Sequence, residues 1–185
     1  EEENYDVYGF NVETGSEFPV ATGPKRNYEP EIDGSTIVWN DCDAVSVMDL
    51  ETGQIKAVNP SCGSKHHPVV SGKSLAFFQY GSSIYLHHLT YGASSHITRS
   101  EVYGSCRIGT NGRVVVWSDY RNGDPDTGRD IYGYDFLEEE EIPICLAPGN
   151  QEHVQISGDI VVWEDHRSGS QIYGYNLETG EEFLI

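Results

Sequence analysis

Three aspartates in one polar segment have the spacing of a calcium-binding loop. Asp124, Asp126 and Asp130 stand at loop positions 1, 3 and 7, with Gly128 at position 5. Because Ca²⁺ takes about six to eight oxygen ligands from alternating loop positions, the spacing is compatible with Ca²⁺ as a cofactor. The segment lacks the Asp or Asn and Gly usual at positions 5 and 6, and the distal Glu. A solvated polar loop is therefore the preferred interpretation, and a Ca²⁺ site is the alternative.

A second candidate metal site combines a carboxylate with two imidazoles. Glu29, His67 and His153 align, together with Ser105, at the start of the first strand of successive sequence repeats. If those strands line a central channel, the side chains converge at one of its mouths, where they suit Zn²⁺ or another transition metal. Channel-lining residues without a ligand are the preferred alternative, because the radius of the ring can hold these groups apart.

Two Asp-x-Arg pairs have the residue types of a catalytic pair. Asp119 precedes Arg121 by two residues, and Asp165 precedes Arg167 in the same way. An Arg two residues after an Asp across a tight turn can lock that turn through a charge-assisted hydrogen bond. We therefore assign both pairs a structural role in a turn.

Motifs typical of enzymes are absent from the sequence. It contains no Gly-x-Ser-x-Gly segment, no glycine-rich phosphate loop and no pair of carboxylates shared by position across repeats. Glu29 and Glu152 keep one catalytic alternative open, a glycosidase-type propeller with acids at the channel mouth. The prediction is nevertheless a protein that is not an enzyme.

The elements that must position these residues come from an internal repeat. Four segments share a glycine followed five residues later by a large aromatic residue: Gly34–Trp39, Gly72–Phe77, Gly112–Trp117 and Gly158–Trp163. The aromatic residues lie 38, 40 and 46 residues apart. A second block follows each segment: Val45–Leu50, Ile84–Leu89, Ile131–Phe136 and Ile172–Leu177, with a fifth copy at Val7–Val12.

Each repeat is expected to form four antiparallel strands. In the last repeat we expect them at His153–Ser157, Asp159–Glu164, Gln171–Leu177 and Glu182–Ile185, from alternating side chains and glycine-containing turns. Four strands every 38 to 46 residues is the size of one β-propeller blade. The sequence therefore predicts an all-β propeller of about five blades in a single domain over residues 1–185. Its units are a half-repeat at 4–24 and repeats at 25–61, 62–100, 101–149 and 150–185.

The aromatic residues that recur with the repeat are predicted to form the core between blades rather than sugar-stacking platforms. They are Trp39, Trp117 and Trp163 and, in a second phase, Tyr8, Tyr85, Tyr132 and Tyr173.

Residues 161–180 carry a resemblance to a known family. Val161–Gly169 includes the Asp-x-Arg-x-Gly segment, which is followed by Ile172–Gly180, and Asp119, Arg121 and Gly123 repeat the segment. These residues resemble the β-propeller repeats of TolB-like proteins, in particular those found in tandem on archaeal and bacterial cell-surface proteins, including those of methanogens. The resemblance implies a propeller that binds or builds at the cell surface rather than one particular activity.

Composition excludes several kinds of partner. Of the 185 residues, 30 are Asp or Glu and 11 are Lys or Arg, a net charge of −19, which disfavours binding to nucleic acid or anionic lipid. The apolar runs are too short for a transmembrane helix. The acidic start, Glu1–Glu3, cannot be the n-region of a signal peptide and is compatible with a mature terminus.

The four cysteines form neither a zinc-ribbon nor a haem-attachment pattern. In an up-and-down blade, Cys42 and Cys62 fall in loops on the same side of the ring, so a disulfide between them is predicted, whereas a bridge between Cys106 and Cys145 is less convincing. An oxidising, extracellular location is therefore expected.

The sequence thus predicts an extracellular, non-enzymatic module that binds a protein or builds a structure. The partner is expected to be a protein. The half-repeat lacks its first two strands, so either the chain is a piece of a longer repeat array, or a second copy fills the missing edge through strand exchange that gives a polymer. The alternatives are a carbohydrate-binding propeller and the glycosidase-type enzyme.

Overall fold

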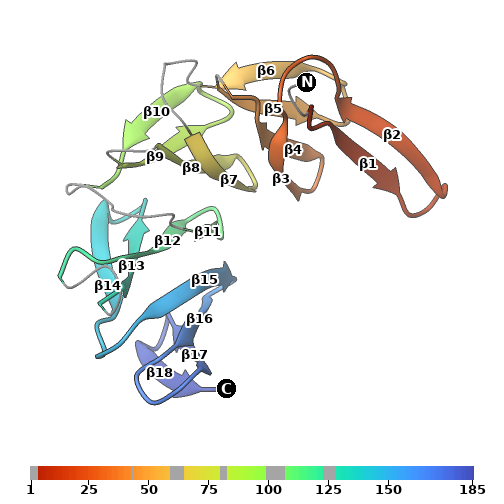
Figure 1. Cartoon of the computed structure of the whole chain (residues 1–185). Helices are drawn as coiled ribbons and strands as arrows, with labels where there is room; N and C mark the ends of the chain where they lie inside the picture. Colours follow the sequence, from red (N-terminus) through yellow and green to blue (C-terminus); the bar gives the residue numbers. More distant parts are fainter. Residues whose placement is uncertain (1–3, 43, 59–64, 80–82, 99–106, 123–127) are drawn as a thin grey trace.

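A computed structural model describes residues 4–42, 44–58, 65–79, 83–98, 107–122 and 128–185. These residues form β-strands and no helix, so none of the described segments is a helix that could cross a membrane. The strands group into one two-stranded and four four-stranded sheets (Figure 1). The predicted all-β propeller architecture of four full repeats and one half-repeat is therefore confirmed.

We call the first sheet the N-terminal hairpin and the others blades I to IV. The hairpin consists of β1 (Val7–Asn11) and β2 (Ser16–Ala21). Blade I consists of β3 (Tyr28–Asp33), β4 (Thr36–Asn40), β5 (Val45–Asp49) and β6 (Ile55–Val58). Blade II consists of β7 (Lys65–Ser71), β8 (Ser74–Gln79), β9 (Ser83–His88) and β10 (Ala93–His96). Blade III consists of β11 (Ile108–Thr110), β12 (Val114–Asp119), β13 (Asp130–Asp135) and β14 (Glu140–Cys145). Blade IV consists of β15 (Gln151–Ser157), β16 (Ile160–Asp165), β17 (Gln171–Asn176) and β18 (Glu181–Leu184).

Short polar motifs set the turns between the strands. In blade IV, Gly158 joins β15 to β16 with φ of 55°, a conformation that glycine adopts without steric cost. After β5, the Asp49 carboxylate accepts hydrogen bonds from the backbone N–H groups of Glu51 and Thr52, both at 2.9 Å. Asn176 accepts the equivalent bonds after β17. The Asx residue before each Glu-Thr-Gly segment therefore fixes where the third strand ends.

The hydrophobic core lies between sheets. Trp163 of blade IV packs with Ile131 and Ile144 of blade III, and Trp117 of blade III packs with Ile84 of blade II. Trp39 of blade I packs with the hairpin in the same manner. All three tryptophans are almost fully buried, as the repeat predicted. Each sheet thus depends on its neighbour to remove its apolar side chains from water.

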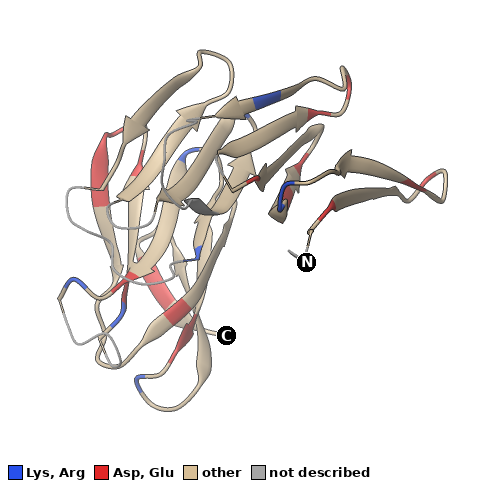
Figure 2. Cartoon of the chain, turned by 45° about the horizontal axis from the view of Figure 1, so that its top comes forward, with Lys and Arg blue, Asp and Glu red and all other residues tan. Residues whose placement is uncertain are grey.

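The sheets follow an open arc, with the first strand of each blade on the concave side (Figure 1). The N-terminal hairpin and blade IV stand at opposite ends of this arc and are apart in both views (Figures 1 and 2). Acidic residues are spread over strands and turns, with few Lys and Arg between them (Figure 2). The described residues therefore form consecutive blades of a propeller without a closed ring.

Candidate functional site

The first strands of the blades line a hollow on the concave side of the arc. A cavity of about 320 Å³ is bordered by Glu29 and Glu31 of β3, His67 of β7 and Gln155 of β15. Arg107, immediately before β11, supplies a positive charge. The volume is at the lower end of the roughly 300–1,000 Å³ usual for small-molecule sites. Pro68, Val69 and Ile108 complete the wall, so charged, polar and apolar side chains from four blades line the hollow together.

A bulge recurs where three of these strands enter the channel. The strand register shifts between Tyr28 and Glu31 in blade I and at the matching points of blades II and IV. The extra residue has positive φ in each case: 52° at Glu29, 49° at His67 and 54° at His153. Positive φ is uncommon for residues other than glycine, so the chain holds a sparsely populated conformation here.

The structure brings Glu29 and His67 together. One oxygen of Glu29, Oε2, accepts hydrogen bonds from the backbone N–H of His67 at 2.8 Å and from Asn40 Nδ2 at 2.6 Å. The other oxygen, Oε1, lies 3.3 Å from His67 Nδ1. The Glu29 carboxylate thus ties blade I to blade II.

His153, predicted to join them, has a different partner. Its Nδ1 lies 3.0 Å from Glu164 Oε2, and Glu164 also contacts Ser170 and His166. The hydrogen bonds from Ser170 and then His153 hold the pKa of Glu164 below its usual value. In the described part of the chain, no group of three or more His, Cys, Asp or Glu side chains is placed to hold a metal ion.

The fourth channel position was misassigned from the sequence. Arg107 lies five residues before the turn glycine Gly112, as His153 lies five residues before Gly158, and Arg107 borders the cavity. Ser105, which the sequence alignment placed there, lies outside the described residues. Counting back from the turn glycine would have found Arg107. Glu152, the second acid of the glycosidase alternative, forms an ion pair with Arg129 at 3.6 Å.

The two Asp-x-Arg pairs form matching contacts in blades III and IV. Arg121 donates from Nε and Nη2 to the fully buried carboxylate of Asp119, and Arg167 does the same to Asp165. Each aspartate also accepts from the preceding Trp Nε1 at 2.9 Å.

Both arginines have a second acidic partner on the fourth strand. Arg121 Nη1 donates to Glu141 at 2.6 Å and Arg167 Nη1 to Glu182 at 2.7 Å. Each guanidinium also lies over a tyrosine ring, 4.0 Å from the Tyr132 centroid and 4.2 Å from that of Tyr173. Burial disfavours the charge on Asp165, but the hydrogen bonds from Arg167 and Trp163 outweigh it, so the pKa of Asp165 is lowered. The pairs link the second, third and fourth strands of their blades.

Two further predictions fall partly outside the described residues. Asp124 and Asp126 of the predicted calcium loop lie outside the described residues. Asp130 begins β13, where it is buried and contacts Asn122 and Tyr132. Burial raises the pKa of Asp130. Cys62 and Cys106 also lie outside. The Cys42 thiol is free in the structure and donates to the Arg26 carbonyl at 3.4 Å, and Cys145 is free and buried. The calcium site and the Cys42–Cys62 bridge therefore stay predictions.

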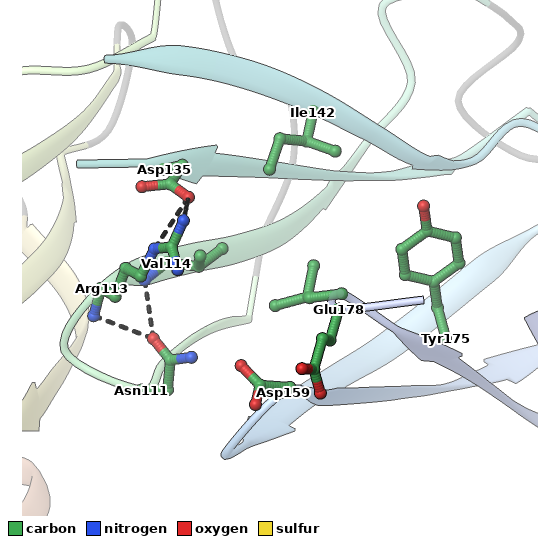
Figure 3. A pocket seen from close by; sticks show the side chains of 9 residues that line it. Asn111, Arg113, Val114, Asp135, Ile142, Asp159, Tyr175 and Glu178 are labelled. Atoms are coloured by element: carbon green, nitrogen blue, oxygen red, sulfur yellow. Dashed lines mark hydrogen bonds and ion pairs between the residues drawn. The ribbon is translucent and has the colours of Figure 1, made fainter. Parts of the chain in front are cut away.

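A small cavity lies between blades III and IV (Figure 3). Its volume is about 240 Å³, and its apolar walls include Val114 and Ile142. On one side, Arg113 is paired with Asp135 at 2.7 Å, and the carboxylates of Asp159 and Glu178 lie across from this pair (Figure 3). The cavity is smaller than usual ligand sites, so it accommodates at most a small group.

The ends of the arc expose side chains that are buried elsewhere in the repeat. Ile172 of blade IV is 48% exposed, whereas its counterparts Val45, Ile84 and Ile131 are fully buried. At the other end Tyr8 is 54% exposed. The prediction that Tyr8 belongs to the core is therefore wrong, because no sheet in the described part of the chain covers that side of the hairpin.

No protein-family model matches the sequence, and no curated protein matches it. Among solved structures, TolB from Acinetobacter baumannii superposes with a TM-score of 0.70 at 18% identity, over 97% of this chain and 48% of that chain. The fold is that of a TolB-like β-propeller. An oligogalacturonate lyase in complex with manganese gives 0.62 at 14% identity, over 98% and 59% of the two chains. A nidogen/laminin complex gives 0.67 at 11% identity, over 96% and 70%.

The TolB-like propeller fold is compatible with both binding and catalysis. One matching structure is a lyase and another is a protein complex, so fold likeness alone does not separate these roles. The chain spans about half the length of the TolB chain that it matches.

Proposed function

We propose that this chain is a non-enzymatic, protein-binding propeller module of the cell surface, which binds a β-strand segment of its partner along β1. The fold is one that also occurs in a nidogen/laminin complex. The resemblance of the repeats to those of archaeal and bacterial surface proteins supports the location. The net charge of −19 favours proteins over nucleic acid or anionic lipid as partners.

The edge of β1 that faces away from β2 carries this proposal, because no strand of the described residues pairs with it. The third strand of every blade, β5, β9, β13 or β17, is hydrogen-bonded on both sides. In contrast, β1 pairs with β2 alone within the described residues. An unpaired edge presents a row of backbone N–H and C=O groups, and an added strand satisfies them.

The repeat defines the chemistry of the strand that fits. In blade IV, β16 occupies the equivalent edge of β17 in antiparallel register, with Val162 opposite Gly174 and Trp163 opposite Tyr173. A segment resembling the β15–β16 hairpin, with alternating apolar side chains and a glycine turn, therefore matches β1.

A peptide with the sequence of residues 150–166 tests the proposal. It contains β15 and β16, and fluorescence anisotropy with the intact chain is expected to show saturable binding. The matched control peptide carries Val161→Pro and Val162→Pro. Because neighbouring N–H groups point to opposite sides of a strand, one of the two prolines removes a donor toward β1. Absence of binding, or equal binding of the proline peptide, overturns strand addition.

The surface location predicts an oxidised chain. Chain secreted into an oxidising medium is expected to contain the Cys42–Cys62 bridge. Intact mass spectrometry without reduction should give a mass lower by two hydrogens than that of reduced chain. A Cys42→Ser variant is the control, and an unchanged mass of the secreted wild-type chain contradicts the prediction.

A further inference from the structure

The cavity between blades III and IV carries more negative than positive charge. Arg113 is paired with Asp135, whose Oδ2 lies 2.9 Å from Nε and 2.7 Å from Nη2 of the guanidinium. The exposed carboxylates of Asp159 and Glu178 lie across from that pair (Figure 3). Neither of them is within ion-pair distance of a basic side chain in the part of the chain that the structure describes. Two carboxylates therefore remain to attract a cation.

The apolar walls of the cavity decide which kind of cation fits. Val114, Ile142 and Leu177 line it, together with Tyr175. Ca²⁺ takes about six to eight oxygen ligands, and no described group of three or more His, Cys, Asp or Glu is placed to hold a metal ion. A lysine side chain, in contrast, lays its aliphatic stem along apolar surface and keeps its ammonium among polar groups. The lining therefore favours an alkyl ammonium over a metal ion.

The interface between blades I and II holds a lysine in the equivalent place. Lys56 of β6 occupies the strand position that Ile142 occupies in β14. Its Nζ donates a hydrogen bond to the carbonyl of Leu89, across the interface, at 3.0 Å. Leu89 is the residue of blade II that corresponds to Leu177 in the wall of the cavity. The chain thus places an ammonium here in one interface, and in the other has the shorter, uncharged side chain of Ile142.

The acids of the cavity are present where the chain has no lysine of its own. In blade II, the counterparts of Asp159 and Glu178 are Lys73 and Thr90. In blade III, a basic and an apolar residue stand at these positions, Arg113 and Leu137. Among the three interfaces between blades, the one between blades III and IV therefore combines an open cavity with two acids at its rim.

We infer that this cavity binds an alkyl ammonium, the end of a lysine side chain of a protein partner. The stem lies along Ile142, and the ammonium contacts Asp159 and Glu178 together with the Leu177 carbonyl, the counterpart of the acceptor of Lys56. The inference rests on the proposed protein-binding function and adds a contact in a different sheet interface from the β1 edge. It names the charge that a partner must bring to this face.

Nuclear magnetic resonance of the intact, ¹⁵N-labelled chain tests the inference with Nα-acetyl-lysine N-methylamide as the probe. The matched control probe is Nα-acetyl-norleucine N-methylamide, which has an aliphatic side chain without the ammonium. The lysine probe is expected to shift the signals of the Leu177 backbone amide and of Arg113 Nε saturably, and the norleucine probe is not. Added NaCl should weaken binding, because the two carboxylates are exposed and salt screens them.

Variants of the chain separate this cavity from the general acidity of the surface. Asp159→Asn and Glu178→Gln are each expected to weaken binding about two- to fivefold, and the double variant to abolish it. Glu51→Gln removes the same charge from the corresponding turn of blade I and should keep the wild-type affinity. Ile142→Lys, which repeats the arrangement of Lys56, should also prevent binding because its own ammonium occupies the cavity. Circular dichroism should show that each variant keeps its β-sheet signal.

Several outcomes would overturn the inference. They are no saturable shift with the lysine probe, equal binding of the norleucine probe, an unchanged affinity of the double variant, or as large a loss in Glu51→Gln. Ca²⁺ that shifts the same signals at lower concentration than the probe would identify a metal site instead. The peptide of residues 150–166 contains no lysine, so its binding tests strand addition separately. Peptide binding without probe binding leaves strand addition standing and removes the lysine site, and probe binding without peptide binding does the reverse.

Discussion

The buried carboxylate of Asp165 depends on a few donors for its charge. It is fully buried, and its two oxygens receive the Arg167 guanidinium and the Trp163 indole N–H. A buried charge without a partner is costly, since the interior solvates it poorly. Blade I holds its tryptophan in another way, with Trp39 donating to the Asn27 side chain. The ion pair therefore belongs to the blades that have the Asp-x-Arg segment.

Removal of the arginine should destabilise the chain. We expect Arg167→Leu to lower the free energy of unfolding by about 2–4 kcal/mol, somewhat less than for a fully buried pair because Arg167 is partly exposed. Urea denaturation measures this change. Lys25→Leu is the control, because Lys25 pairs with Asp41 at the surface at 3.9 Å and such pairs contribute roughly 0–1 kcal/mol. Equal effects of the two substitutions would contradict the assignment.

The Asp165–Arg167 pair also makes the difference in unfolding free energy between wild type and Arg167→Leu depend on pH. The folded-state pKa of Asp165 is lowered, so its stabilising contribution is present in full above the unfolded-state value of about 3.9. That contribution is lost as pH falls through the lower, folded-state pKa. Asp165 titrates alike in the two unfolded chains, so the gap in unfolding free energy between wild type and Arg167→Leu follows the two folded-state pKa values. The gap should be largest near neutral pH and should narrow in acid as Asp165 becomes protonated, because a neutral carboxyl no longer needs the guanidinium. A gap that widens in acid would be inconsistent with this charge pairing.

Calcium binding at the Asp124–Asp130 loop is tested by melting. Ca²⁺ that binds only the folded chain should raise the melting temperature. At a free Ca²⁺ concentration a hundredfold above Kd, the free energy of unfolding increases by about 2.7 kcal/mol. Asp126→Ala is expected to abolish the rise, and Glu51→Ala, a change of the same charge in a distant turn, to keep it. Differential scanning fluorimetry with Ca²⁺ or EDTA measures both. No rise in wild type, or the same rise in Asp126→Ala, would identify a solvated loop instead.

Residue types and spacing predicted which residues line the hollow, but not which of these side chains contact one another. The sequence places Glu29 and His67 at equivalent positions, and the structure brings them within 3.3 Å of each other. The partner of His153, Glu164, lies on the neighbouring strand and could not be read from the repeat. The other three blades have Asn40, Phe78 and Ser118 at that position. The exposed fraction of Tyr8 depends on whether another sheet covers the hairpin, and the residues around Tyr8 in the sequence do not indicate this.

At the scale of the strand, the sequence predicted the number and spacing of the strands closely and their ends less closely. The four strands expected in the last repeat are present, with ends shifted by one or two residues. Such shifts are normal, since strand ends depend on tertiary pairing. The bulge at Glu29, His67 and His153 was not predicted, because positive φ is uncommon for any residue other than glycine, even for His, which adopts it more often than most, and the residue types alone do not reveal it.

Glycine in the third strand makes room for a fourth-strand side chain. A methyl group at Gly133 would lie 3.1 Å from Ile144 and 3.4 Å from Val114, inside the core between blades III and IV. At Gly174 it would meet the Phe183 ring at 2.6 Å, but that ring is 39% exposed and can move outward. The same substitution therefore has different consequences in the two blades.

We expect Gly133→Ala to cost about 1–3 kcal/mol of unfolding free energy, the usual range for overpacking, and Gly174→Ala to cost less than about 1 kcal/mol. Chemical denaturation of both variants measures the difference, and each serves as the control for the other. If Gly174→Ala is the more damaging of the two, the side of blade IV that carries Phe183 is not open as described.

The whole molecule shows how far a repeat predicts architecture. Four full repeats and one half-repeat predict the sheets and their order, because each blade can bury its apolar side chains only against the next. Whether the arc closes is set by contacts outside any one repeat. In the described residues, Ile172 and Tyr8 are the two ends of a series whose inner members are buried. The pattern that specifies each interface therefore does not by itself say which further sheet, if any, covers Ile172 or Tyr8.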